Sequence, residues 1–370
     1  MSGRPSPVAL LPPLYARWID TLLESPIPPE TRATCDDCAM CAPDGTRAEE
    51  KAFYFSPRVK CCTYQPMLPN YLVGRALEDR DFAFSAGRAT LERRMDAGVG
   101  VTPLGVGAPR TFSVLYENSA QKAFGQAVSM RCPHYLEKGG GRCGIWRHRN
   151  SICTTWFCKL ERGAVGSAFW DRTRNLLMAI ERGLAVWSAL EAGLEAEAFG
   201  AILPLDERPG KREPMTAADV DGVADPAIAR KLWGAWFGRE REFYGLCGRR
   251  VEPLTWPDVE RICGSGVAAL AHLTRHSFRA LLSEELPERL GAGSFEIIST
   301  SREAIRVVGY AGTDPLDLDP AVMEILPYFD GHPTVQALST IQEELGIEVE
   351  EDLVRKLADF EILKPRSDLL

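Results

Sequence analysis

The chain has 370 residues, of which 45% are hydrophobic and 25% are charged, and its formal net charge is −8. This composition is ordinary for a globular protein with a buried core, and the length predicts two or three domains rather than one compact core. The sequence contains no run of 18 apolar residues, which predicts that no helix crosses a membrane and argues against a membrane partner.

Eleven cysteines are a high number for a chain with this composition. Residues 1–20 are interrupted by prolines and lack the continuous apolar segment of a secretory signal, so we expect a cytoplasmic protein. Thiols stay reduced in that compartment. Clustered cysteines are then better explained as metal ligands than as disulfides.

The net charge is unevenly distributed along the chain. Residues 31–163 contain 19 Lys and Arg against 13 Asp and Glu, a net of +6, whereas residues 293–370 contain 6 against 16, a net of −10. The acidic segment would repel a phosphate backbone, so we expect no nucleic-acid partner. It would attract a basic peptide or protein.

The predicted elements begin with a helix over residues 14–24, which the proline-rich stretch 25–30 ends. The cysteine region follows, to about residue 160, and it is rich in Gly and Pro. Residues 51–55 have the composition of a short strand. We expect a mixed, loop-rich fold in this region, in which bound metal replaces part of the apolar core.

Residues 164–193 predict one long amphipathic helix, because apolar residues recur at steps of three and four. A polar linker with prolines covers residues 205–216. Further helices are predicted over 225–247, 256–274 and 277–286, and this helical body is expected to pack on the cysteine region. The apolar residues of the long helix are Val165, Phe169, Leu176, Ile180, Leu184, Trp187 and Leu190.

The last part of the chain predicts two strands followed by three short helices, which together form a winged-helix-like module. A proline is tolerated in the first turn of the first of these helices. The strands cover residues 295–300 and 304–310, and the helices begin at Asp319-Pro320, at Thr334 and at Glu348.

These elements predict an α+β fold that is mainly helical. It consists of a loop-rich, metal-binding cysteine region over residues 1–163, a helical region over 164–290 and the winged-helix-like module over 293–370.

The first group of cysteines, Cys35, Cys38 and Cys41, forms a CxxCxxC run. Two intervening residues allow neighbouring sulfurs to turn onto one centre, and three such cysteines suit an iron–sulfur cluster, whose irons are spread over several ångströms. The bacterial ferredoxin run requires another cysteine four residues on, where this chain has Gly45. The fourth ligand is therefore expected from a distant part of the sequence.

Cys61 and Cys62 are adjacent, and because successive side chains diverge, only one of them is expected to bind a given metal; we assign Cys62. The isolated Cys247 and Cys263 are better explained as small buried hydrophobic residues. A second cysteine-rich stretch supplies the remaining candidate ligands, which are Cys132, Cys143, Cys153 and Cys158.

The thiol-rich set favours an iron–sulfur cluster, most simply a 4Fe–4S cluster, with zinc as the alternative. A single zinc would use only half of these cysteines. The surplus indicates either two metal centres or one cluster with additional redox-active thiols.

Several polar residues near the cysteines are further candidates for the site. His134 and His148 are expected to lie at the surface or to form hydrogen bonds rather than to act as ligands. Arg147 and Arg149 are suited to balance thiolate charge. The glycines of residues 139–141 predict a turn between ligands rather than a phosphate-binding loop.

Residues 143–153 resemble the C-x-I-Y-x-x-R-P-x-x-C signature of the zinc- or iron-chelating cysteine-cluster family, the YkgJ-like family. The CxxCxxC run and Cys132 with its following proline match that family's other motifs, and the likeness covers about residues 30–160. Trp146 replaces the usual Tyr and Asn150 replaces the Pro. The resemblance implies a bound metal, and the related pattern of flagellin lysine-N-methylases implies an iron–sulfur cluster.

Residues 294–365 resemble the PqqD-like peptide-recognition winged helix. The resemblance implies a module that pairs the edge of its sheet with an extended peptide. The shared residues are Leu318, Asp319, Ile325, Leu326, Asp330, Gly331, Thr334, Val335, Leu357, Ile362 and Leu363.

The sequence contains no recognisable catalytic acid, base or nucleophile, so it leaves open whether the protein is an enzyme. Three functions fit the pattern. One is a peptide- or protein-modifying maturation factor with an iron–sulfur cluster, the second is a non-catalytic adaptor with a structural zinc, and the third is a protein that stores or delivers metal.

Overall fold

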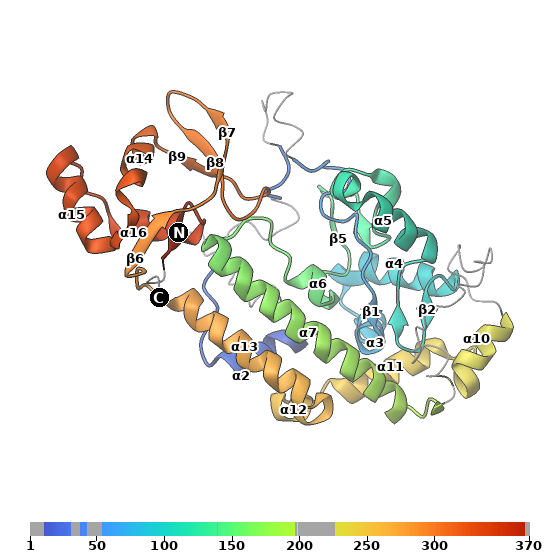
Figure 1. Ribbon diagram of the computed structural model, residues 1–370. Coiled ribbons are helices and arrows are strands. Elements are labelled where there is room, and N and C mark those ends of the chain that lie inside the picture. Colours follow the sequence, from blue (N-terminus) through green and yellow to red (C-terminus); the bar gives the residue numbers. More distant parts are fainter. Residues whose placement is uncertain are drawn as a thin grey trace, which may run out of the picture. The chain divides into compact units, whose positions relative to one another are not determined.

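The protein has a mixed α and β fold that is mainly helical, as predicted, with small antiparallel sheets (Figure 1). Among the residues described below, no helix combines the length and the apolar character needed to cross a membrane. The computed structural model describes residues 11–30, 38–42, 54–138, 140–196, 198 and 226–366.

The chain divides into two compact units. The division falls inside two helices, α7 (Gly163–Glu191) and α13 (Ser265–Leu282). The helical residues from 174 to 271 therefore share a unit with the cysteine region. The first unit contains the described residues up to 27, from 33 to 156 and from 174 to 271, and the second contains those from 28 to 32, from 157 to 173 and from 272 onward.

The predicted first helix is confirmed as α2 (Pro13–Leu23). Its apolar face is buried in the first unit, where the Trp18 side chain is fully enclosed and its Nε1–H donates to the carbonyl of Leu254 at 2.9 Å. The predicted long helix is confirmed as α7, whose continuous apolar repeat places Leu176, Ile180 and other side chains in the core.

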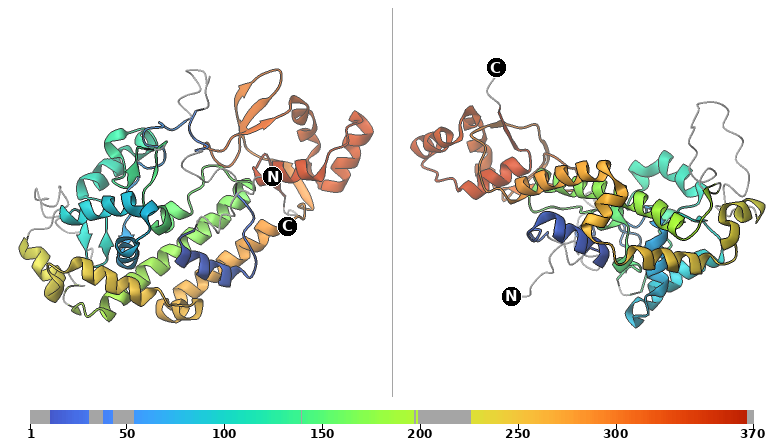
Figure 2. Two further views of the ribbon diagram at one scale, coloured as in Figure 1. Left: turned by 180° about the vertical axis from the view of Figure 1, so that it is seen from behind. Right: turned by 90° about the horizontal axis from the view of Figure 1, so that it is seen from below.

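The helix α11 (Glu240–Val251) packs against α3 (Asn70–Glu78) at very close range (Figures 1 and 2). The closeness depends on glycine, because a Cβ atom at Gly74 would lie 1.8 Å from the carbonyl oxygen of Tyr244. This contact joins the helical residues to the cysteine region, as the sequence predicted.

The described part of the cysteine region contains three helices of nine or more residues that the sequence pattern did not predict, together with short hairpins. A three-stranded antiparallel sheet has the order β1-β3-β2, and a separate hairpin pairs β4 with β5. The helices are α3, α4 (Ser85–Asp96) and α5 (Arg110–Ala123), and the strands are β1 (Leu68–Pro69), β2 (Val101–Thr102), β3 (Gly105–Val106), β4 (Tyr135–Leu136) and β5 (Arg142–Cys143).

Two predicted helical segments have different boundaries in the structure. The segment 225–247 is broken into α10 (Pro226–Trp233) and α11, because Gly234 and Gly238 adopt positive φ angles between them. The predicted break between 274 and 277 is wrong, since α13 runs through it.

The helix break in that part of the chain lies earlier, at Gly264. This residue has a φ of 77° and ends α12 (Trp256–Cys263), so that α13 begins at the next residue. Ser277 therefore lies inside α13, where its hydroxyl donates to the Thr274 carbonyl at 3.0 Å.

The second unit contains the predicted strands and short helices. Asp319 caps the first helix by accepting a hydrogen bond from the N–H of Ala321. One antiparallel sheet has the order β7-β8-β9 and another the order β10-β6-β11. The strands are β6 (Arg289–Ala292), β7 (Glu296–Thr300), β8 (Ile305–Val308), β9 (Leu316–Leu318), β10 (Asp330–Pro333) and β11 (Leu363–Pro365), and the helices are α14 (Pro320–Ile325), α15 (Thr334–Leu345) and α16 (Glu351–Asp359).

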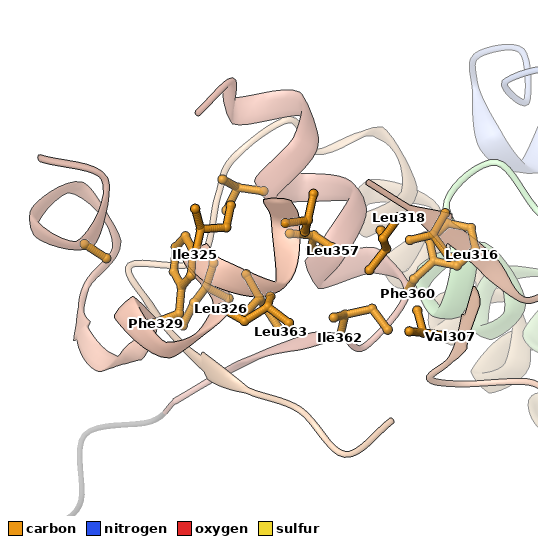
Figure 3. Packing of buried hydrophobic residues seen from close by; sticks show 14 of the residues in the cluster. Val307, Leu316, Leu318, Ile325, Leu326, Phe329, Leu357, Phe360, Ile362 and Leu363 are labelled. Atoms are coloured by element: carbon orange, nitrogen blue, oxygen red, sulfur yellow. The ribbon is translucent and has the colours of Figure 1, made fainter. Parts of the chain in front are cut away.

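An apolar core of its own holds this C-terminal part together (Figure 3). Phe329 and Ile325 lie at one end of the cluster, and Leu357 on α16 contributes to its centre. Because side chains from both sheets and from the helices are fully enclosed, residues 289–365 have the buried apolar material of an independent module.

Candidate metal centre

The first described thiols belong to Cys38 and Cys41, which lie in one tight turn. The N–H of Cys41 donates to the Cys38 carbonyl at 2.9 Å, and Cys41 forms an isolated bridge with Phe55. The two thiols are hydrogen-bonded, and burial together with the neighbouring Cys38 raises the pKa of Cys41 to about 11. Two thiols of the CxxCxxC run therefore meet, while Cys35 lies outside the described residues.

Cys61 and Cys62 lie in a second turn, built around Lys60. Lys60 has a left-handed φ of 51°, and the N–H of Cys62 donates to the carbonyl of Val59 at 2.9 Å. The two thiols are hydrogen-bonded to each other, which lowers the pKa of Cys61 and raises that of Cys62. That only one of these two thiols binds a given metal stays a prediction.

The Lys60 side chain joins this turn to the second cysteine stretch. Its Nζ donates to the carbonyls of Gly140 and Gly141 at 2.7 and 2.8 Å. Both glycines have positive φ angles and lie at the tip of the β4–β5 hairpin, which confirms the predicted turn between candidate ligands.

Cys132 and Cys143 are brought to Cys62 by the backbone. The N–H of Cys132 donates to the Cys62 carbonyl at 2.7 Å. The N–H of Tyr135 donates to the Cys132 carbonyl at 3.1 Å, and Tyr135 pairs with Cys143 across the hairpin. Burial raises the pKa of Cys132 to about 11, an effect that the backbone N–H of His134 opposes by donating to the sulfur.

Cys153 is positioned by the short helix α6 (Ser151–Thr154). The side chain of Asn150 caps this helix by accepting a hydrogen bond from the Cys153 N–H at 3.1 Å. Burial raises the pKa of Cys153, and the thiols of Cys143 and Cys132 add to the rise because they lie near enough to repel its thiolate.

The structure thus brings together thiols from four separate segments of the first unit. Each of these cysteines is partly exposed, in contrast to Cys247, which is buried and whose thiol donates to the carbonyl of Ser188. Cys158 belongs to the second unit. The thiols that are coupled by hydrogen bonds or by charge are Cys38, Cys41, Cys61, Cys62, Cys132, Cys143 and Cys153.

Two cationic side chains that the sequence did not single out lie beside the thiols. Lys60 favours the thiolate forms of Cys41 and Cys61, against the burial that disfavours them. Arg94, on α4, is buried and acts in the same way on Cys132. The only sequence signal for cationic side chains beside these thiols is the excess of positive charge in residues 31–163.

Arg149 is the third cation at the site and was predicted to balance thiolate charge. Its guanidinium stacks on Trp146, and its Nη1 donates to the Cys153 carbonyl at 3.0 Å. Its charge favours the thiolate forms of Cys61 and Cys153. The Arg149 guanidinium is therefore fixed beside the thiols of Cys61 and Cys153.

The two histidines near the cysteines are buried and take part in hydrogen bonds, so the predicted hydrogen-bonding role is confirmed and the alternative of a surface position is wrong. Nδ1 of His134 lies 2.8 Å from the Thr90 hydroxyl, and burial lowers the pKa of His134 to about 3, so its ring stays neutral. Nε2 of His148 lies 2.9 Å from a carboxylate oxygen of Asp79. Arg147 forms an ion pair with Asp81.

Among the residues that the structure describes, no three His, Cys, Asp or Glu side chains surround one point closely enough to hold a single metal ion. Comparisons with protein-family models, with curated proteins and with solved structures found no match to this chain.

Proposed function

We propose that the chain is an iron–sulfur protein that modifies or matures a peptide or protein, and that its C-terminal module binds that partner. The observation that carries the proposal is the convergence of thiols from four segments of the first unit, three cationic side chains among them. Thiolate is the form that binds metal. The cations favour this form in Cys41, Cys132 and Cys153, against the burial that raises the pKa of all three thiols.

The residues fit an iron–sulfur cluster in both chemistry and charge. Each cysteine of a cubane cluster binds a different iron, so the cluster does not need three ligands around one point. The N–H of His134 is directed at the Cys132 sulfur, and such hydrogen bonds stabilise a charged ligand. When bound, a cluster would supply electron transfer or a Lewis-acidic iron. The proposed ligands are Cys38, Cys41, Cys62, Cys132, Cys143 and Cys153, with Cys35 and Cys158 as further sequence candidates.

The resemblance of residues 30–160 to the YkgJ-like cysteine-cluster family supports the metal, and the thiol chemistry suits a reducing compartment such as the cytoplasm. Arg149, a member of that family's motif, stacks on Trp146, the residue that replaces the motif's Tyr. The aromatic ring at position 146 therefore holds the guanidinium of Arg149 in place by stacking.

The C-terminal module supports the second half of the proposal. Its sheet β7-β8-β9 has two outer strands, and an extended peptide can be added to a strand of this kind through backbone hydrogen bonds. The net charge of −10 over residues 293–370 favours a basic peptide. The resemblance to the PqqD-like modules points to the same partner.

The iron–sulfur part is tested by purifying the chain without oxygen, recording its absorption spectrum and measuring iron, zinc and acid-labile sulfide. We expect a brown protein with iron and sulfide in equal amounts, and loss of colour in Cys153→Ser. A colourless chain with one inert zinc would overturn the proposal in favour of a structural adaptor. Metal that a chelator removes at once would favour storage or delivery.

The partner part is tested by measuring the binding of extended basic and acidic peptides of matched length to the full chain at low and high salt. We expect the basic peptides to bind more tightly, by about tenfold or more at low salt, with the difference falling as salt rises. Equal binding of both classes would contradict a charge-selected peptide partner.

A further inference from the structure

A buried acidic residue interrupts the apolar face of the long helix α7. Glu181 is only 8% exposed, and it lies among Leu177, Ile180 and Leu184, whose side chains are fully enclosed. Burying a carboxyl group costs free energy unless other hydrogen bonds replace those that it makes with water. An apolar side chain would fill this position without that cost. The role of Glu181 therefore lies in the groups that its carboxyl group binds.

The carboxyl group of Glu181 binds the first residue of α6, the short helix that carries Cys153. Its Oε1 accepts a hydrogen bond from the backbone N–H of Ser151 at 2.6 Å, and its Oε2 accepts one from the Ser151 hydroxyl, also at 2.6 Å. The hydroxyl of Tyr15, on α2, donates to Oε1 as well. Bonds at both oxygens fix the orientation of the carboxyl group, and all of these residues belong to the first unit.

The helix α6 needs contacts of this kind, because it contains only four residues. A single helical turn is not stable alone, since its few internal hydrogen bonds do not offset the entropy lost in ordering the chain. The capping residue Asn150 gives it a second anchor, because its Nδ2 donates to the carbonyl of Met67 at 3.2 Å. Cys153 thus follows, within one turn, two residues that are each fixed to another part of the first unit.

We infer that Glu181 is a positioning residue for Cys153, because its bonds to Ser151 connect the long helix α7 to the turn that presents this thiol. Thiols that come from different segments must be held in fixed positions to bind one centre. The inference rests on the proposed function for Cys153 as a metal ligand. The fixing of α6 by Glu181 can be measured whether or not a metal is bound.

The test measures amide hydrogen exchange of full-length variants in the peptide that covers residues 150–155. The double variant combines Glu181→Leu with Tyr15→Phe, so that the Tyr15 hydroxyl is not left without its acceptor. We expect exchange in this peptide to be about tenfold faster than in the wild type. Glu181→Gln should restore the wild-type rate, because the amide oxygen accepts the bonds from Tyr15 and from the Ser151 N–H while the amide nitrogen donates to the Ser151 hydroxyl oxygen.

The matched control is Glu30→Leu. Glu30 is equally well buried and also accepts a hydrogen bond from a backbone N–H, that of Glu161 at 2.9 Å, but it belongs to the second unit. This change should leave exchange in residues 150–155 at the wild-type rate. Wild-type exchange in the double variant would overturn the inference. Exchange that is accelerated as much by Glu30→Leu or by Glu181→Gln as in the double variant would overturn it too.

The effect on metal binding is measured separately, by competition between the full chain and a chelator for Zn²⁺. We expect the double variant to bind Zn²⁺ about tenfold more weakly or worse, and Glu181→Gln to bind it like the wild type, because residues that orient ligands affect affinity to this extent. Faster exchange with unchanged Zn²⁺ affinity would support the positioning and overturn Cys153 as a ligand. A wild-type chain that binds no metal would overturn the proposed function, and the exchange rates would still decide the positioning.

Circular dichroism shows whether the double variant is folded. If it is not, Ser151→Ala decides, since it removes only the bond between the Ser151 hydroxyl and Oε2 of Glu181. We then expect exchange in residues 150–155 to be about threefold faster, the effect of one lost hydrogen bond. A wild-type rate in Ser151→Ala would overturn the inference.

Discussion

The guanidinium of Arg149 lies over the indole ring of Trp146, with its Cζ 3.4 Å from the ring centroid. The pair fixes a buried positive charge beside Cys61 and Cys153, because the stacked geometry and the bond to the Cys153 carbonyl leave the side chain little freedom. The thiols of Cys61 and Cys153 therefore lie beside a positive charge whose position is fixed.

Replacing Arg149 by Gln should raise the pKa of Cys61 in the metal-free chain, because one of the charges that favour its thiolate is removed. At pH 7 we expect alkylation at this position to slow by about three- to tenfold, since only the thiolate reacts. The rate of alkylation is measured by mass spectrometry of the peptide that contains Cys61. Arg147→Gln is the matched control, because Arg147 pairs with Asp81 instead. Equal rates in the two variants would contradict the role of Arg149.

Glu181 is a buried carboxyl group that accepts hydrogen bonds from the Tyr15 hydroxyl and from the N–H and hydroxyl of Ser151, the latter two at 2.6 Å. Burial raises its pKa from 4.5 to about 7. The folded chain therefore keeps this proton at pH values where the unfolded chain has lost it. Its contribution to stability is present below about pH 4.5 and declines as the pH rises to about 7.

Glu181→Gln should remove that pH dependence, because the amide does not titrate. The difference in unfolding free energy between wild type and variant is expected to change by about 1 to 3 kcal/mol between pH 5 and pH 8. Urea unfolding of the metal-free chain at both pH values measures it. Parallel pH profiles for the two proteins would show that Glu181 does not titrate in this range.

Gly74→Ala should destabilise the first unit, because the new Cβ would lie 1.8 Å from the Tyr244 carbonyl oxygen and would push α3 away from α11. We expect a loss of about 1 to 3 kcal/mol and a lower melting temperature by calorimetry. Gly266→Ala in α13 is the matched control, since nothing lies within 4 Å of its Cβ, and it should be neutral or slightly stabilising. A Gly74 variant as stable as this control would disprove the tight helix contact.

Arg162 is expected to stabilise the second unit. Its guanidinium binds the carboxylate of Asp359, which is buried, and donates to the carbonyls of Leu281 and Ser283 at 2.7 and 3.1 Å. Arg162→Ala would leave the Asp359 charge buried without this partner, at a cost of about 3 kcal/mol. Faster hydrogen exchange in the C-terminal module would report the loss.

The matched control for that change is Arg306→Ala in the same unit. Arg306 pairs with Asp317 at 2.7 Å, but this ion pair is exposed, so its loss should cost less than about 1 kcal/mol. If both variants exchanged equally fast, burial would not be what distinguishes the two ion pairs.

The elements that could be predicted from the sequence are those whose apolar residues carry the pattern. α7 begins and ends within two residues of its predicted bounds, because its apolar repeat is continuous. α4 was missed, because its buried face is made of Gly87, Thr90, Leu91 and Arg94 rather than a stripe of large apolar side chains. Two of those residues serve the site, where Thr90 holds His134 and Arg94 lies near Cys132.

The candidate site could be predicted as a group of cysteines but not as an arrangement. Spacing identified the thiols. The turn that places Cys61 and Cys62 depends instead on the left-handed φ of Lys60, a conformation that residues other than Gly, Asn and Asp seldom adopt. The beginning of α13 likewise depends on the positive φ of Gly264, whereas the sequence predicted a break between residues 274 and 277.

Lys60 connects the two cysteine stretches without the help of any sulfur, through its bonds to the carbonyls of Gly140 and Gly141. The backbone that carries the proposed ligands is thus held by the Lys60 ammonium group alone, so binding of a metal would cost little further chain entropy. We therefore expect the chain to be folded without metal, rather than to fold only when a metal binds. Treatment with a chelator should leave its helical circular dichroism spectrum nearly unchanged.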